Sequence, residues 1–310
     1  MENLADPKVL VMRKYAYYAD LSFKTKLLNA VRKGFRYQPL ESLLRRMVNG
    51  RPADSALARM VPPEYLYAKG SWRNLEYKGL KYHLDLSNAT DHGAYYDLLD
   101  TGDDRLKSLV RPEHVIVDIG ANIGIRSMAF AQMVPKGRVL SFEPDPNTFK
   151  RLKQHINSNA LSNVETVNMG IGPKESTERL YQVVNSNSGM NRIVSDPSKM
   201  QDFAYSEVRI TPLDPVLARL GITHVDVIKI DVEGFEMEVL KGCAAVLERD
   251  HPVLFIELDD DNLRENGSSA TALLNWLVAL GYDVERADTQ EPVHIGPEHC
   301  HFDILCVRRT

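Results

Sequence analysis

The chain has 310 residues, of which 44% are hydrophobic and 26% are charged, and its formal net charge is −4. This composition is typical of a globular protein and excludes a wholly disordered one. Three cysteines are too few for a disulfide framework, and no apolar run reaches the ~20 residues of a membrane span. Because residues 1–8 lack the apolar core of a signal peptide, we expect a cytoplasmic protein.

Residues 1–63 are predicted to form a basic helical extension, in which apolar residues recur at helical spacing. Eleven lysines and arginines fall within residues 8–51 against two acids, so this arm carries +9, whereas residues 52–310 carry −11. The arm could bind an anionic membrane surface or a lipid-linked acceptor, which would place the protein peripherally at the membrane. It could equally be a solvated helix face. No nucleic-acid-binding motif accompanies the arm, so nucleic acid is not an expected partner.

Residues 64–111 are predicted to be a lead-in segment or cap. Residues 75–77 and 81–86 resemble a short hairpin, and a helix is expected between Tyr95 and Leu109.

From residue 112 onward, short apolar runs alternate with amphipathic segments. Strands are expected at 115–117, 138–142, 164–167, 226–230, 253–256, 282–286 and 302–307, with helices between most of them. This order is typical of an α/β fold, so we predict a doubly wound, seven-stranded, Rossmann-like sheet with an antiparallel C-terminal hairpin. Residues 173–206 are polar and are predicted to be a loop insertion in the domain at 112–310.

Four predicted strands end in an acid: Asp118, Glu143, Asp231 and Glu257. Ligands of open α/β sheets bind beyond the carboxyl ends of the strands, at the point where the strand order reverses. These four positions are therefore the first candidates for a functional site.

The stretch at 118–124 reads Asp-Ile-Gly-Ala-Asn-Ile-Gly. Gly120 and Gly124 permit a tight turn and a close approach of a ligand to the backbone, and the following helix offers its N-terminal amides. Glu143 lies 23 residues after Gly120, where a carboxylate can accept hydrogen bonds from both hydroxyls of a ribose. The pattern predicts a cofactor that contains a nucleoside.

The turn favours S-adenosylmethionine over a nicotinamide dinucleotide. A dinucleotide loop would have a glycine at the position of Asn122, and Asp118 would repel a pyrophosphate but attract a sulfonium or an amino group. The residues expected to hold the cofactor are Asp118, Gly120, Ala121, Asn122, Gly124, Glu143 and Asp231.

A second motif, Ile-Lys-Ile-Asp-Val-Glu-Gly-Phe-Glu, occupies residues 228–236. Together with the first motif, Phe142-Glu143-Pro144, Leu213-Asp214 and Leu240-Lys241-Gly242, it closely resembles the FkbM family of S-adenosylmethionine-dependent methyltransferases. The resemblance covers about residues 112–258 and implies a class I methyltransferase domain. It also implies O-methylation of hydroxyl groups on sugars or on polyketide-type natural products. Acceptor specificity is expected in the N-terminal ~90 residues and in 173–206, which lie outside the resemblance.

Three residues of the second motif are candidates for catalysis. Asp231 could remove the proton of the acceptor hydroxyl, or could instead bind the amino group of the cofactor. Glu233 could be the base, or could be satisfied by backbone amides at the start of the next helix. Lys229 lies on the same strand face as Asp231 and is expected to pair with it or with Glu257.

A metal is a further possibility at these strand ends. Asp231, Glu257 and Asp259 offer the oxygen ligands that magnesium prefers, and a bound cation would acidify an acceptor hydroxyl. The alternative is an exposed acidic loop.

The sequence thus favours an O-methyltransferase that acts on a hydroxyl of a sugar, glycan or glycoconjugate. The alternatives are methylation of a polyketide or other small natural product, an NAD-dependent dehydrogenase, and a methyltransferase-like binding module without catalysis. Whether the chain forms a homo-oligomer is left open by the sequence.

Overall fold

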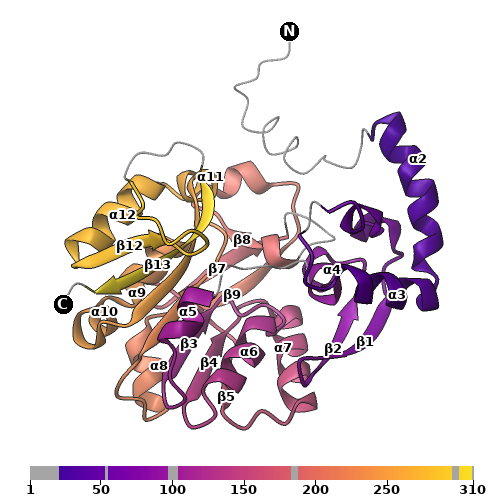
Figure 1. The fold of residues 1–310 in the computed structure, drawn as a ribbon. Helices are drawn as coiled ribbons and strands as arrows, with labels where there is room; N and C mark the ends of the chain where they lie inside the picture. The colour runs from indigo at the N-terminus through magenta and orange to yellow at the C-terminus, as the bar shows by residue number, and fades with distance from the viewer. Residues whose placement is uncertain (1–20, 53–54, 97–103, 183–187, 295–299, 309–310) are drawn as a thin grey trace. The chain divides into compact units, whose positions relative to one another are not determined.

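The chain divides into two compact units in a computed structural model (Figure 1). Unit 1 consists of residues 1–100 and 183–190, and unit 2 consists of residues 101–182 and 191–310. The residues that the structure describes are 21–52, 55–96, 104–182, 188–294 and 300–308. The first part of the predicted basic arm, residues 8–20, and the middle of the helix expected after Tyr95 lie outside the described residues.

Unit 1 contains short helices and one hairpin. Its elements are α2 (Phe23–Arg32), η1 (Lys33–Arg36), α3 (Gln38–Val48), η2 (Ala58–Met60), η3 (Glu64–Leu66), β1 (Trp72–Tyr77), β2 (Leu80–Asp85), α4 (Ala89–Tyr96) and η4 (Ser188–Met190). Ser22 caps α2 by accepting a hydrogen bond from the backbone amide of Thr25. The buried carboxylate of Glu41 on α3 accepts two hydrogen bonds from Arg73 on β1, which joins the helical part to the hairpin.

Unit 2 is built on the seven-stranded sheet that the sequence predicts. The strands are β3 (Val115–Ile119), β4 (Arg138–Phe142), β5 (Val164–Val167), β10 (Val227–Ile230), β11 (Val253–Asp259), β12 (Tyr282–Arg286) and β13 (His301–Arg308). Their order in the sheet is β12-β13-β11-β10-β3-β4-β5. β13 runs antiparallel to both β11 and β12, which confirms the antiparallel C-terminal hairpin. β3 has β4 on one side and β10 on the other, so the strand order reverses at β3.

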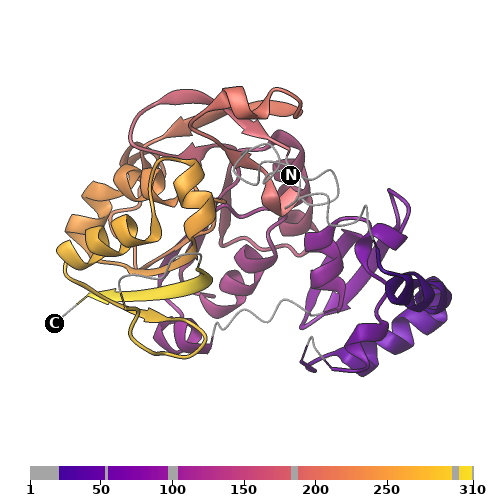
Figure 2. The ribbon, with the colours of Figure 1, turned by 90° about the horizontal axis from the view of Figure 1, so that it is seen from above.

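Helices cover both faces of this sheet (Figure 1 and Figure 2). They are α5 (Asp104–Leu109), α6 (Ile125–Met133), α7 (Pro146–Ser158), α8 (Leu213–Arg219), α9 (Glu236–Gly242), α10 (Ala244–Asp250), α11 (Asp260–Glu265) and α12 (Ala270–Ala279). Alternate residues of each strand supply two separate cores. Ile228 and Ile230 pack into the core formed with α8, α9, α10 and α12, whereas Val227 packs into the core formed with α5 and α6. Asp145 caps α7 with Pro146 in its first turn, as predicted.

The polar segment 173–206, predicted to be a loop, contains parts of a second sheet. Its strands are β6 (Gly170–Ile171), β7 (Ser176–Tyr181), β8 (Arg192–Ile193) and β9 (Tyr205–Thr211), in the order β6-β9-β7-β8, and η5 (Pro197–Met200) lies between the last two in sequence. A small core of Leu180, Ile193, Val208 and Ile210 stabilises it. So few apolar residues, spread along the chain, do not produce a strand pattern that is visible in the sequence.

None of the helices within the described residues has the length and hydrophobicity needed to span a bilayer.

Candidate functional site

A glycine turn follows β3 at the point where the strand order reverses. Gly120 has φ +80°, and a Cβ at this position would lie 1.8 Å from the carbonyl oxygen of Asp231. The amides of Gly120 and Ala121 donate to the carbonyl of Phe142, at 3.0 and 2.9 Å. The turn is therefore in close contact with the ends of both β10 and β4, and only glycine fits at its first position.

The second half of the turn leads into α6. Gly124 has φ +87°, and a Cβ there would lie 2.5 Å from Cδ1 of Leu152. Asn122 has φ +50°, and its buried side-chain oxygen has no hydrogen-bond partner within the described part of the chain. An unsatisfied buried acceptor at a turn of this kind indicates a place for a ligand donor.

Glu143 ends β4 with its carboxylate fixed from both sides. Oε2 accepts from the amide of Asn122 and Oε1 from the amide of Asp145, each at 2.9 Å. Burial raises the pKa of Glu143 to about 8, and the two amides oppose part of that rise. Each carboxylate oxygen keeps a free lone pair, so the group can accept two further hydrogen bonds.

Lys229 connects the turn to two carboxylates. Its buried ammonium donates to the carbonyl of Gly120 at 3.1 Å and lies 3.2 Å from Asp231 and 3.4 Å from Asp118. The pairing with Asp231 that the sequence predicted is confirmed, and Asp118 is a second partner because the two residues face each other in the β3–β10 register. Burial lowers the pKa of Lys229, but both carboxylates outweigh it, so the pKa stays above its ordinary value.

The two partners of Lys229 differ in exposure. Asp118 is 0% exposed, and its other oxygen accepts from the hydroxyl of Ser127. The side chain of Asp231 is 41% exposed. Asp118 therefore contributes to the site through Lys229, whereas Asp231 is available to a ligand.

Three carboxylates meet at the carboxyl ends of β10 and β11. Asp231, Glu233 and Glu257 each offer an oxygen within 4.8 Å of the other two. Burial raises the pKa of Glu233 to about 8 and that of Glu257 well above its ordinary value, and the charge of Asp231 adds to both shifts. A carboxylate with a raised pKa is a stronger base than an ordinary one.

Glu233 is positioned by two residues that the sequence analysis missed. It has φ +55°, and its Oε2 accepts from the side-chain amide of Asn262 at 2.9 Å. The buried Arg192 on β8 in turn donates to the oxygen of that amide at 2.7 Å. Because 70 residues separate Arg192 from Asn262, no local pattern in the sequence indicates this pair.

The backbone amides at the start of α9, which the sequence offers as partners for Glu233, donate to Glu236 instead. Its Oε1 accepts from the amides of Val232 and Gly234, at 3.3 and 3.0 Å, and burial raises its pKa to about 7. The oxygens of Glu233 are consequently not needed to cap α9.

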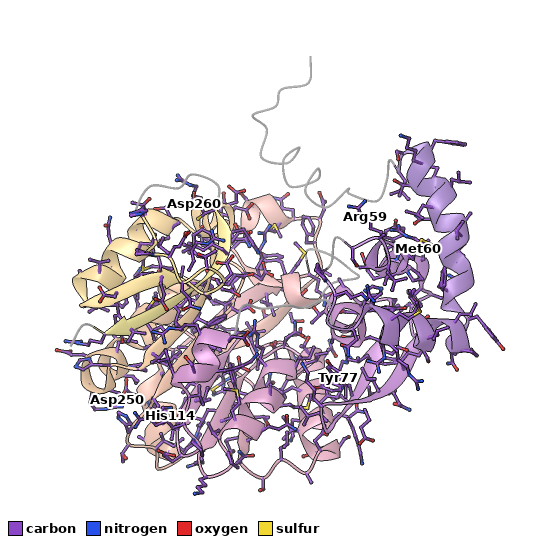
Figure 3. The ribbon with its side chains drawn as sticks, in the orientation of Figure 1. Arg59, Met60, Tyr77, His114, Asp250 and Asp260 are labelled. Carbon is purple, nitrogen blue, oxygen red and sulfur yellow. The ribbon has the colours of Figure 1, made fainter. Side chains whose placement is uncertain are left out.

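Asp259, predicted as a metal ligand with Asp231 and Glu257, has other partners. One oxygen accepts from the amide of Asn262 at the start of α11, and the other lies 2.9 Å from Nδ1 of His301. The structure brings Glu233 to the other two carboxylates in its place. Asp260, labelled in Figure 3, is buried and accepts from the amide of Ala270, so it too has a structural role.

We expect Gly120→Ala to lower the free energy of unfolding by about 3 kcal/mol or more. The added Cβ would overlap the carbonyl of Asp231, in addition to the cost of a positive φ. Gly221→Ala is the matched control, since Gly221 has φ +66° but no atom within 4 Å of its added Cβ. In the same denaturant titration, the free energy of unfolding of the control should fall by only about 1 kcal/mol. Equal losses in the two variants would contradict the close contact.

Glu257→Gln should stabilise the protein in a pH-dependent way. Because the folded pKa lies well above 4.5, the folded state retains a proton that the unfolded state loses, and stability falls as pH rises above 4.5 toward the folded pKa. Glutamine removes this ionisation, so we expect a gain of about 1 kcal/mol or more near pH 8 and little change near pH 5. Thermal unfolding of the variant at both pH values, beside the exposed-site control Glu248→Gln, measures the difference. A gain that is the same at both values would show that ionisation is not its cause.

The family model for the methyltransferase FkbM domain matches residues 118–284, more than half of the chain. Three curated relatives are all methyltransferases by name. Methyltransferase sdnD of Sordaria araneosa is 29% identical over 153 residues, which are 41% of this chain and 59% of that protein. The 2-O-methyltransferase NoeI of Sinorhizobium fredii is 25% identical over 180 residues, or 54% of this chain and 73% of NoeI. The hexuronic acid methyltransferase AglP of Haloferax volcanii is 26% identical over 136 residues, or 44% of this chain and 52% of AglP.

The chain thus spans less than two thirds of sdnD and of AglP. The matched region of the family model begins at Asp118 and contains the glycine turn, Glu143 and the three-carboxylate cluster. The chain belongs to the FkbM family of methyltransferases.

Proposed function

We propose that the protein is an S-adenosylmethionine-dependent O-methyltransferase that acts on a hydroxyl group of a sugar, glycan or glycoconjugate. The observation that carries the proposal is the position of Glu143 and the carboxylate cluster. Glu143 follows β4 on one side of β3, and the cluster lies at the carboxyl ends of β10 and β11 on the other side, so the glycine turn after β3 lies between them.

The residues around the turn fit S-adenosylmethionine. Glu143 has lone pairs for the two ribose hydroxyls, and the orphaned oxygen of Asn122 can accept from a donor on the cofactor. Asp231 would attract the cationic amino group, and Gly120 lets the turn pack directly against the backbone of Asp231. The cofactor, when bound, supplies a methyl group activated by a sulfonium.

Glu233 is our candidate for the base. The carboxylate of Glu233 would accept the proton of the acceptor hydroxyl when its oxygen receives the methyl group that the bound cofactor would supply. Asp231 is the weaker candidate, because its charge is stabilised by Lys229, whereas burial makes Glu233 more basic.

The names of two relatives support parts of the proposal. The 2-O-methyltransferase NoeI supports transfer to an oxygen, and the hexuronic acid methyltransferase AglP supports a sugar acceptor. A small natural product is the alternative acceptor. A methyl-transfer screen that includes hexoses, hexuronic acids, lipid-linked glycans and polyketides separates the two.

Above pH 8, where Glu143 is ionised, we expect Glu143→Gln to weaken S-adenosylmethionine binding by about 10- to 100-fold, since hydrogen bonds to a charged acceptor contribute about 1.5–3 kcal/mol. Isothermal titration calorimetry with the cofactor measures the change. Glu165→Gln, an exposed substitution on the neighbouring strand β5, should leave the affinity unchanged. An unchanged affinity in Glu143→Gln would refute the ribose role.

The rate of methyl transfer should depend on the ionisation of Glu233. A base acts in its ionised form, so kcat/KM should rise with pH up to about 8 and then level off. Glu233→Gln should lower kcat by about 10²- to 10⁴-fold and remove this rise. Asn262→Leu removes a donor that favours the ionised carboxylate, so it should move the rise to higher pH. A pH profile unchanged in Glu233→Gln would rule out this base.

Asp231, Glu233 and Glu257 could instead bind a divalent cation. Activity that survives exhaustive chelation would support the role of Glu233 as a base. Activity that is lost on chelation and restored by magnesium would assign the three carboxylates to a cation instead.

A further inference from the structure

The exposed large apolar side chains of the described residues are concentrated in one short segment. Seven of the ten lie between residues 23 and 47, and the other three are Trp72, Tyr205 and Val278. The seven are Phe23, Leu27, Val31, Tyr37, Leu40, Leu43 and Met47. Single exposed apolar residues are common, but a group of this size indicates an interaction surface.

On α2 the exposed apolar residues form one row. Phe23, Leu27 and Val31 are spaced four apart and are 82%, 62% and 54% exposed. The opposite side of the helix is bound to unit 1 by polar contacts. Asn29 donates to the hydroxyl of Tyr65 at 2.9 Å, and Arg32 donates to the carbonyl of Arg59, at 2.8 Å for Nε. Arg59 is labelled in Figure 3. The row therefore faces away from the rest of its unit.

On α3 the apolar side is only partly covered. Leu44 and Val48 are buried, whereas Leu40, Leu43 and Met47, on the neighbouring strip of the same helix, are 44%, 54% and 47% exposed. The helix thus has more apolar surface than its own unit buries.

Cations flank the row on α2. At 100° per residue, Lys24 lies on one side of Phe23, Leu27 and Val31, and Lys26 and Lys33 lie on the other. All three lysines are exposed, as are Arg36, Arg46 and Arg51.

No exposed acid offsets these cations within residues 21–52. The single acid there, Glu41, is buried and is neutralised by Arg73. All exposed charged residues of the segment are therefore positive.

We propose that the α2 face, which consists of the row Phe23, Leu27 and Val31 with the lysines beside it, binds the surface of an anionic lipid bilayer. A bilayer has apolar chains directly beneath a layer of phosphates, so it can bury the apolar row and pair with the lysines beside it. α2 has 10 residues and is about 15 Å long, enough to lie in the plane of the interface. The inference concerns unit 1 alone and does not depend on the proposed reaction.

Flotation of the full chain with vesicles tests the proposal. We expect binding to phosphatidylcholine vesicles that contain phosphatidylglycerol, weaker binding at high salt, and little binding to phosphatidylcholine alone. Lys24→Glu, Lys26→Glu and Lys33→Glu combined should lower the partition coefficient about tenfold or more. Phe23→Ser, Leu27→Ser and Val31→Ser combined should have a similar effect by removing the apolar row.

The matched control makes the same charge change elsewhere. Lys136→Glu, Lys150→Glu and Lys174→Glu combined replace three exposed lysines of unit 2 and should leave vesicle binding unchanged. An equal loss of vesicle binding in this control would show that binding depends only on the net charge of the protein, and would overturn the proposal.

Light scattering without vesicles measures whether the chain forms a dimer, and so tests whether a second copy of the chain covers this face instead of a bilayer. A dimer that the serine variant dissociates, together with no binding to the anionic vesicles, would assign the face to self-association and overturn the proposal. Since all six substituted positions are exposed, thermal unfolding should show the variants to be as stable as the parent chain.

Discussion

The site depends on one buried ammonium group. Lys229 lies inside the sheet of unit 2, where an unpaired charge would be strongly destabilising, and its neighbours are arranged to compensate it. It binds the carbonyl of Gly120 and the carboxylates of Asp118 and Asp231. The same lysine thus fixes the turn after β3 and the acid that ends β10. Replacing it by an apolar residue would leave the buried carboxylate of Asp118 without its cation and would also remove the ion pair of Asp231, so the turn and the acid are structurally coupled.

The acids around this lysine differ because their surroundings differ. Asp118 is enclosed with its cation, and Glu236 is committed to the backbone at the start of α9. Glu143 is buried and Glu233 and Glu257 are half-buried, none with a cation of comparable proximity, and desolvation raises their pKa values. Asp118 thus forms an ion pair with Lys229, and Glu236 caps α9 although burial raises its pKa to about 7. Glu143 and Glu233, whose pKa values are raised to about 8, can exchange a proton near neutral pH, as acid–base chemistry requires.

The net charge of −4 combines two segments of opposite character. Residues 8–51 are strongly basic, and their described part exposes seven large apolar side chains and no acid. Residues 52–310 are acidic, and several of their acids end strands at the proposed site. Each charge imbalance is confined to its own segment. The positive charge of residues 8–51 suits binding to an anionic surface, and the acids of residues 52–310 suit a cationic cofactor and a proton transfer.

The sequence by itself determined the strands of the seven-stranded sheet, the glycine turn, the acid after β4 and the need of Lys229 for a carboxylate partner, which it left open between Asp231 and Glu257. These features depend on hydrophobic periodicity, on turn chemistry and on neighbours in one strand, all of which are local. Only the tertiary structure decided that residues 173–206 contribute to a second sheet, and that Arg192 and Asn262 position Glu233. It also decided that Glu233, and not Asp259, joins the cluster. These outcomes depend on contacts between segments far apart in the chain. The sequence pattern does not distinguish the several polar side chains near the site, whereas packing and burial in the folded chain decide which of them make contact.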